Sequence, residues 1–369
     1  MHKILSRIIP VALTAALLAA CGSSTAPSIM TGAQAQPATQ AGTVADSATA
    51  AAPAVSAATA AAEKEAARPA ATETTAQTAE ATRIALDGSA IAVDGKGASV
   101  DGSRVTITAA GTYELSGSLT EGQIIVDTGD EETVTLILNG VDISNSTSAP
   151  LYITDAEDVT IVLADGSTNR MADGAGYVFA SPDEDEPNAV LFSKADLTIG
   201  GSGALVVAGN YNDGIASKDG LTITGGDITV EAVDDGIRGK DYLVVEGGTL
   251  TVTAGSDGLK ADNEEDAALG YISIEDGVFN VTAGGDAITG ETDVLILAGD
   301  FTLKSGGGSS ARLDETVSAK AIKASANVDI DSGTFVIDAA DDAVHSNTNI
   351  VINGGDFTIA TGDDGVHAD

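Results

Sequence analysis

A short acidic motif recurs through the C-terminal half of the chain at a nearly constant spacing. Its copies read NDGIASKD, DDGIRGKD, SDGLKADN, DDAVHSNT and DDGVHAD. When the small residue after the acid is taken as a marker, successive markers lie 22, 22, 29, 34, 22 and 22 residues apart. A base period of 22 residues, with two longer repeats, predicts stacked copies of one structural unit. The markers are Gly214, Gly236, Gly258, Ala287, Ala321, Ala343 and Gly365.

Apolar residues and one glycine keep the same register in each repeat. An alternating pair such as Leu221/Ile223 precedes a glycine such as Gly226, and a second pair such as Ile228/Val230 follows it. Alternation with period two is typical of strands and excludes helical repeats. A unit of three short strands has a single apolar side, so it must stack on its neighbours to bury that side.

We therefore predict an all-β fold, a right-handed parallel β-helix with three strands and about 22 residues per coil. Looser copies of the pattern between Val105 and Ile199 bring the total to roughly nine coils. The glycine column predicts a turn with positive φ in each coil. Four phenylalanines in register predict an internal aromatic stack, namely Phe279, Phe301, Phe335 and Phe357.

The first 20 residues have the pattern of a lipoprotein signal peptide. Lys3 and Arg7 precede an apolar run that ends in Leu-Ala-Ala-Cys at Cys21, which resembles a bacterial lipobox. We expect cleavage before Cys21 and lipid attachment to its thiol, and a single cysteine allows no intrachain disulfide. Residues 21–82, rich in Ala, Thr, Ser, Gln and Pro, predict a disordered tether.

Residues 83–369 are the predicted folded domain. The lipid would hold it on the extracellular face of a bacterial membrane, and no other membrane contact is expected. Because the sequence stops at Asp369 inside a repeat, with no polar cap, we expect the repeat array to be truncated there.

Equivalent residues of successive coils lie above one another in such a fold. The acids before the markers then form a column with carboxylates about 4.8 Å apart, which repel unless protons, cations or basic side chains compensate them. A basic column beside it supplies part of the compensation, but a formal charge of −38 leaves many acids without a partner.

We predict that calcium ions offset the remaining repulsion between the stacked carboxylates. Calcium takes about six to eight oxygen ligands, which carboxylates and carbonyls at stacked turns can offer. The alternative is that Asp suits turns through its own hydrogen bonds. The candidate ligands are Asp213, Asp234, Asp235, Asp257, Asp286, Asp341, Asp342 and Asp364 at the first turn, Asp219, Asp241 and Asp262 at the next turn, and Asp183 and Asp185 in the insert SPDEDEPN.

Longer strings in the same region resemble a bacterial family. GTYELSGSLTEGQIIVD, DEDEPNAVLFSKADLTI and NYNDGIASKDGLTITGG are similar to the carbohydrate-binding domain-containing proteins over residues 83–369. The resemblance implies a calcium-binding right-handed parallel β-helix like that of polysaccharide lyases, with cellulose and polygalacturonate as ligands and without catalysis. Ala287, Ala321 and Ala343 depart from the family's marker glycine, and Lys320 interrupts the Asp column, which argues against a continuous calcium ladder.

Binding of an extended polysaccharide is the predicted function. Rungs about 4.8 Å apart suit a polymer whose sugar units repeat at a similar length. The absence of Trp and the acidic charge favour a calcium-bridged acidic glycan over bare cellulose. The predicted contacts are Arg238, Lys260, Lys323, His345 and His367 of the basic column and the rings of Tyr211 and Tyr242.

Two other functions stay open. A calcium-dependent polysaccharide lyase would use calcium to acidify the proton beside a uronate carboxylate, and Arg238 or Lys260 to remove that proton. A structural surface adhesin would act through protein contacts. The sequence contains no nucleotide-binding loop, no Cys/His zinc cluster and no basic patch for nucleic acid. We expect a monomer without catalytic residues that binds no nucleic acid.

Overall fold

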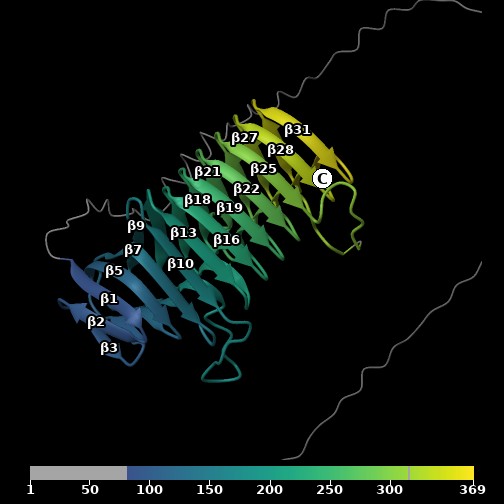
Figure 1. The fold of residues 1–369 in the computed structure, drawn as a ribbon. Helices are drawn as coiled ribbons and strands as arrows, with labels where there is room; N and C mark the ends of the chain where they lie inside the picture. Colours follow the sequence, from purple (N-terminus) through teal and green to yellow (C-terminus); the bar gives the residue numbers. More distant parts are fainter. Residues whose placement is uncertain (1–80, 315) are drawn as a thin grey trace, which may run out of the picture. The chain divides into compact units, whose positions relative to one another are not determined.

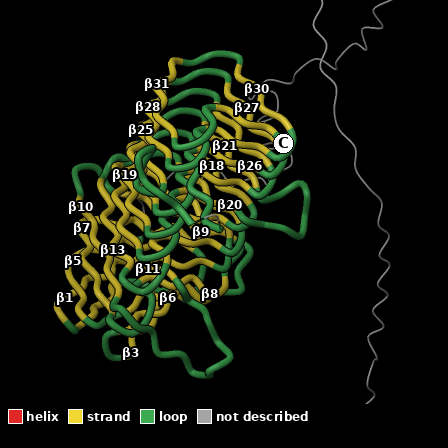
Figure 2. Tube along the Cα trace, turned by 90° about the vertical axis from the view of Figure 1, so that its right-hand side faces the viewer, coloured by secondary structure: helices red, strands yellow, loops and turns green. Residues whose placement is uncertain are grey.

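The computed structural model describes residues 81–314 and 316–369. These residues form strands, turns and loops and no helix (Figure 2), so nothing among them is a helix long and apolar enough to cross a bilayer. The prediction of an all-β fold is confirmed. The predicted signal peptide, Cys21 and the tether up to residue 80 lie outside the described residues.

The strands stack in three parallel ladders, a β-helix-like arrangement (Figure 1). Ladder 1 contains β3 (Ala98–Asp101), β4 (Arg104–Ile107), β6 (Gln123–Asp127), β8 (Leu151–Asp155), β11 (Ala189–Ser193), β14 (Asp213–Ser217), β17 (Ile237–Gly239), β20 (Leu259–Ala261), β23 (Ile288–Gly290), β26 (Ile322–Ala324), β29 (Val344–Ser346) and β32 (Val366–Ala368). Ladder 2 contains β9 (Asp158–Leu163), β12 (Asp196–Gly201), β15 (Gly220–Ile223), β18 (Tyr242–Val245), β21 (Tyr271–Ile274), β24 (Asp293–Ile296), β27 (Asn327–Ile330) and β30 (Asn349–Ile352). Ladder 3 contains β10 (Thr168–Asp173), β13 (Ala204–Gly209), β16 (Asp227–Ala232), β19 (Thr249–Ala254), β22 (Val278–Ala283), β25 (Asp300–Ser305), β28 (Thr334–Ala339) and β31 (Asp356–Thr361).

The N-terminal strands differ from the later coils. β5 (Gly111–Thr120) and β7 (Val134–Asn145) are long, and β7 pairs with β9 through its first half and with β10 through its second half. Ladders 2 and 3 therefore begin as one bent strand that later divides. β1 (Thr82–Gly88) lies parallel to β5, and β2 (Ala90–Asp94) pairs antiparallel with β1. β3 and β4 also pair antiparallel.

The core is a column of aliphatic side chains with an aromatic stack inside it. Phe279, Phe301, Phe335 and Phe357 stack with ring centroids 4.6, 4.7 and 4.4 Å apart, which confirms the predicted ladder. The glycine column also has the predicted positive φ, from 103° at Gly226 to 137° at Gly277. Backbone of this kind strains any residue with a Cβ, so glycine recurs there.

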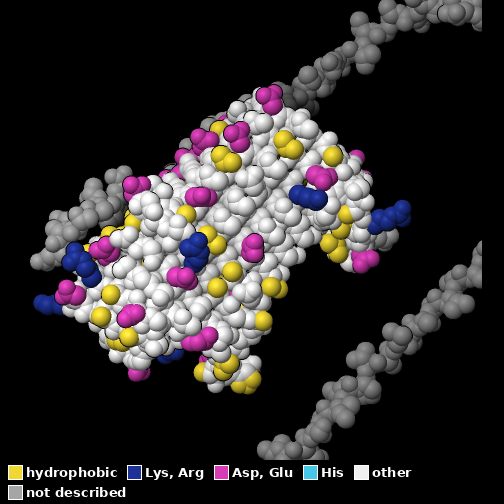
Figure 3. Space-filling view, viewed as in Figure 1, with side chains coloured by type: hydrophobic (Ala, Val, Ile, Leu, Met, Phe, Trp, Pro, Cys, Tyr) yellow, Lys and Arg dark blue, Asp and Glu magenta, His cyan; other side chains and the backbone are white. Residues whose placement is uncertain are grey.

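The extra residues of the longer repeats lie in loops. Residues 262–270 connect β20 to β21, and residues 306–321 connect β25 to β26. A third loop, residues 174–188, joins β10 to β11 and contains the acidic insert; Figure 1 shows it in teal, projecting from the stack. The outer face of ladder 3 carries few charged side chains (Figure 3), whereas ladder 1 carries the paired charges described next.

Candidate functional site

The acidic column lies at the start of the ladder 1 strands, and its carboxylates bind the backbone of the neighbouring coil. The N–H of Asp257 donates to Asp235 Oδ1 at 3.0 Å, and the N–H of Asp286 donates to Asp257 Oδ1 at 2.8 Å. Lys320 and Asp364 repeat the contact, donating to Asp286 at 2.7 Å and to Asp342 at 2.9 Å. The predicted stacking of these acids is therefore confirmed, and each side chain satisfies a backbone donor at a turn.

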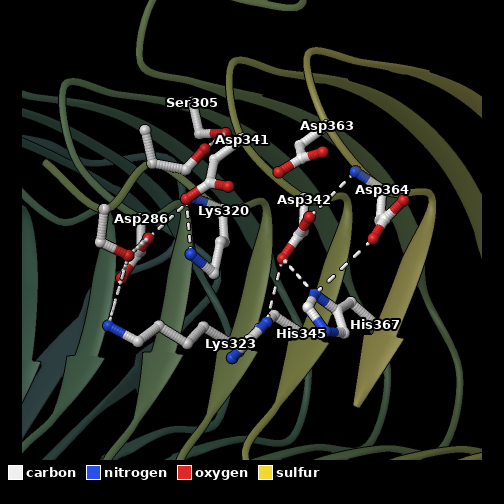
Figure 4. Close-up of polar contacts among 12 residues, drawn as sticks. Asp286, Ser305, Lys320, Lys323, Asp341, Asp342, His345, Asp363, Asp364 and His367 are labelled. Carbon is white, nitrogen blue, oxygen red and sulfur yellow. Dashed lines mark hydrogen bonds and ion pairs between the residues drawn. The ribbon is translucent and has the colours of Figure 1, made fainter. Parts of the chain in front are cut away.

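The second carboxylate oxygen faces a basic side chain. Lys260 Nζ lies 2.9 Å from both Asp235 Oδ2 and Asp257 Oδ2, so one ammonium bridges two rungs. Lys323 Nζ lies 3.0 Å from Asp286 Oδ2, and His345 Nδ1 lies 3.0 Å from Asp342 Oδ2 (Figure 4). Burial opposes the charge of Lys260, but Asp235 and Asp257 outweigh it and raise the pKa of its ammonium group. Basic side chains of this chain thus neutralise much of the column.

Lys320 replaces an acid in the column without breaking the charge pattern. Its Nζ turns to Asp341 Oδ2 in the next coil (Figure 4). Burial disfavours the charged Asp341, but the contact with Lys320 lowers the pKa of this carboxyl below its usual range.

Asp213 has no basic residue on its own rung; the same holds for Asp286, whose rung carries Thr289, but Lys323 of the next coil pairs with Asp286. Ala216 stands where the next rungs carry Arg238 and Lys260, because it packs in a buried cluster with Ala149, Ala189 and Phe192. Burial, and then the charge of Asp235, raise the pKa of Asp213 to about 7, although Arg238 acts against this.

The predicted calcium ligands fall in three separate places and do not converge on one site. Asp235, Asp257 and Asp286 already have an N–H and an ammonium group as partners, so their surroundings do not fit calcium. The first-turn acids lie on ladder 1, the next-turn acids lie between ladders 1 and 2, and Asp183 and Asp185 are exposed in the 174–188 loop.

Two positions do offer oxygen to a cation. Asp341, Asp342 and Asp363 have carboxylate oxygens within 4.8 Å of one another, a spacing that ligands on opposite sides of one calcium ion also have. At the next turn, Asp262 Oδ1 is buried without a hydrogen-bond partner while Arg238 holds Oδ2 at 2.8 Å. Nearby Asp219 has its pKa raised to about 6 by burial, and then by Asp196 and Asp241. At the first position Lys320 and His345 already contact Asp341 and Asp342, so a cation would share or replace these contacts, and at the second position Asp262 offers one free oxygen.

The prediction missed Asp363, although the repeat register places it in line with Asp341. A further group, Asp342 with His345 and His367, also converges within 4.8 Å; His345 and His367 both form contacts with Asp342, at 3.0 and 3.5 Å.

Two of the predicted ligand contacts have buried side chains. Tyr242 is 5% exposed, because its ring lies over Gly220 and its hydroxyl donates to Asp196 Oδ1. His345 is 8% exposed and bound to Asp342 and Asn347. The remaining predicted contacts are partly exposed, and their role in ligand binding stays a prediction; they are Arg238, Lys260, Lys323, His367 and Tyr211.

Comparisons with known proteins agree with this architecture. Residues 101–365 match the family described as carbohydrate-binding domain-containing protein. The chain belongs to this family. A carbohydrate-binding domain-containing protein of Acetivibrio thermocellus is 48% identical over 128 residues, which span 35% of this chain and 45% of that relative. The chain therefore spans less than half the length of that curated relative.

A solved structure resembles the carbohydrate-binding domain-containing protein described here. It is the polysaccharide lyase-like protein from C. thermocellum, solved as a gadolinium derivative, with a TM-score of 0.59 and 33% identity. The similarity covers 75% of this chain and 100% of that structure. The predicted family resemblance is confirmed.

Proposed function

We propose that this chain is a cell-surface lipoprotein that binds an extended, acidic polysaccharide of plant cell-wall type. The binding surface is a β-helix that calcium stabilises. The observation that carries the proposal is the carbohydrate-binding family match, because it extends over residues 101–365, from β3 to the last coil. We also propose that the helix is right-handed, as parallel crossovers are, and has roughly nine coils.

Calcium is part of the proposal because of two observations. The oxygens of Asp341, Asp342 and Asp363 converge within 4.8 Å, and Asp262 has a buried carboxylate oxygen without a hydrogen-bond partner. The solved relative was prepared as a gadolinium derivative. Calcium bound here would add positive charge to an acidic surface and so favour a polyanionic glycan.

Binding is favoured over lyase chemistry by the charge state of the two candidate bases. The pKa values of Lys260 and Arg238 are both raised, because neighbouring Asp residues outweigh their burial. A base that must accept a proton near neutral pH needs the opposite shift. We therefore propose a binding protein rather than a lyase.

A pull-down of the full chain on polygalacturonate and cellulose, with calcium or with EDTA, tests the proposal. Retention on polygalacturonate that EDTA reverses is expected. No retention on any glycan in either buffer would refute it. An ultraviolet absorbance assay for unsaturated products, with Arg238→Ala as the control, would detect lyase activity instead.

The anchoring part of the proposal rests on the sequence around Cys21. Metabolic labelling with a fatty acid should mark the wild-type chain and not Cys21→Ser. Equal labelling of both proteins would contradict lipid attachment at Cys21.

A further inference from the structure

Partly exposed aromatic side chains gather at one place in the described fold. All six Tyr and six Phe of the chain lie in the described residues, and most are buried. Apart from Phe357 at the end of the stacked ladder, the partly exposed ones are Tyr152, Tyr177, Phe179 and Tyr211. Tyr177 and Phe179 belong to the loop between β10 and β11, and both rings contact Tyr211.

Three of these rings line a groove on the outer face of ladder 1. Its volume is about 570 Å³. Gln123 of β6 and Tyr152 of β8 contribute to its floor, Tyr177 and Phe179 of the loop form one wall, and Lys194 after β11 lies at its side. The N-terminal coils thus present a cleft of a size that holds a small ligand.

The wall of this groove is held in place by several contacts. Glu186 pairs with Lys194 at 3.1 Å and with Lys218 at 2.6 Å, across two coils. The hydroxyl of Tyr177 donates to Asp173 at 2.8 Å, and its ring stacks on Tyr211 with centroids 4.3 Å apart. A preorganised wall loses little conformational entropy when a ligand binds.

The chemistry of the lining suits a sugar. Tyr and Phe rings offer flat apolar faces and Tyr adds a polar hydroxyl, which matches the apolar faces and hydroxyls of a pyranose ring. The exposed guanidinium of Arg104, which also lines the groove, offers hydrogen-bond donors to sugar hydroxyls. The lining carries four acids, Asp183, Glu184, Asp185 and Glu186, against two bases, Arg104 and Lys194, so its net negative charge disfavours an anionic sugar.

We propose that this groove is a subsite for uncharged sugar units, separate from the charged column on the later strands of ladder 1. The inference rests on the proposed polysaccharide-binding function and adds to it. Because the groove needs no bridging cation, its occupancy by a neutral oligosaccharide is independent of calcium.

The test is isothermal titration in EDTA of the full chain with cellohexaose, xylohexaose and mannohexaose. At least one should bind, and Tyr152→Ala and Phe179→Ala should each weaken that binding at least tenfold. Val336→Ala, which alters an exposed apolar residue of β28 outside the groove, should leave it unchanged. Wild-type affinity in both groove variants would overturn the subsite.

Hydrogen exchange on the wild-type chain provides a readout that does not depend on variant folding. The bound neutral oligosaccharide should protect β8 and the 174–188 loop. Protection confined to other strands, or binding of polygalacturonate with no binding of the three neutral probes, would also refute the subsite while leaving polysaccharide binding intact. A wild-type chain that binds neither acidic nor neutral glycan refutes the proposed function itself.

Discussion

At the residue scale, the acidic column is stable because most of its carboxylates have two kinds of partner. One oxygen accepts a backbone N–H and the other faces an ammonium or imidazole group, as Asp235 and Asp257 show around Lys260. The stacking was predictable because the period of 22 fixes which residues are neighbours. The hydrogen bonds between carboxylates and backbone could not be predicted, because they depend on the turn conformation that brings each carboxylate to an amide of the neighbouring coil.

Removing the bridging ammonium should destabilise the fold. Lys260→Met leaves Asp235 and Asp257 facing each other in a largely buried setting, and we expect a loss of about 2–4 kcal/mol in the free energy of unfolding, measured by urea denaturation. Lys304→Met is the control, because its contact with Asp338 is 3.8 Å long and exposed, and a loss below about 1 kcal/mol is expected. Equal effects would contradict the bridging role.

The buried Asp213 should make stability depend on pH. With a folded pKa of about 7 against an ordinary value of 3.8, the folded chain keeps a proton that the unfolded chain has released. This group therefore adds stability that is fully present below about pH 4 and is lost as the pH rises through about 7. Asp213→Asn in EDTA should raise the melting temperature at pH 8 by several degrees and change it little at pH 4.

The comparison needs thermal melts of both proteins across this pH range. A variant that is less stable than wild type at pH 8, with an unchanged pH profile, would show that Asp213 is charged and well solvated in the folded state.

At the element scale, the strand pattern of the later coils follows from sequence, and the looser apolar copies between Val105 and Ile199 also fall on strands, from β4 to β12. The glycine column repeats with one register after β15 and the phenylalanine column runs from β22 to β31, so the turns and the aromatic stack were foreseeable. The length of strands β5 and β7 could not be foreseen, because their apolar pattern continues through the position where the later coils turn. A register shift between Leu115 and Gly117 marks that bend.

Neighbouring glycines allow a matched test of the turn. Gly248 has a φ of 106°, and a Cβ there would lie 2.9 Å from the carbonyl oxygen of Gly226, whereas Gly247 has open space around it. Gly248→Ala should cost about 1–3 kcal/mol of unfolding free energy, and Gly247→Ala less than about 1 kcal/mol. Chemical denaturation of both variants measures the difference, and equal costs would contradict the positive-φ turn.

At the scale of the whole molecule, the all-β fold and the family were accessible from sequence, but the aromatic groove was not. A repeat can be recognised in the sequence by its period. Tyr152, Tyr177 and Phe179 are not part of a repeated column, and they line one groove only because an insert folds back over ladder 1. Asp363 was missed although it lies one period of 22 residues after Asp341, so the repeat register alone could have identified it.

Calcium should stabilise the whole stack through the last coils. Saturating calcium at about 100 times its dissociation constant adds about 2.7 kcal/mol to the unfolding free energy of a protein with one site. Asp363→Ala should reduce the calcium-induced rise in melting temperature, because it removes one of three converging carboxylates. Asp300→Ala, an exposed acid on β25, should not. A full calcium effect in Asp363→Ala would place the cation elsewhere.

The most direct test of the account is isothermal titration of the full chain with polygalacturonate, in calcium and then in EDTA. The account predicts saturable binding in calcium that is abolished or at least tenfold weaker in EDTA. Absence of binding in both buffers, or the same affinity in both, would contradict it.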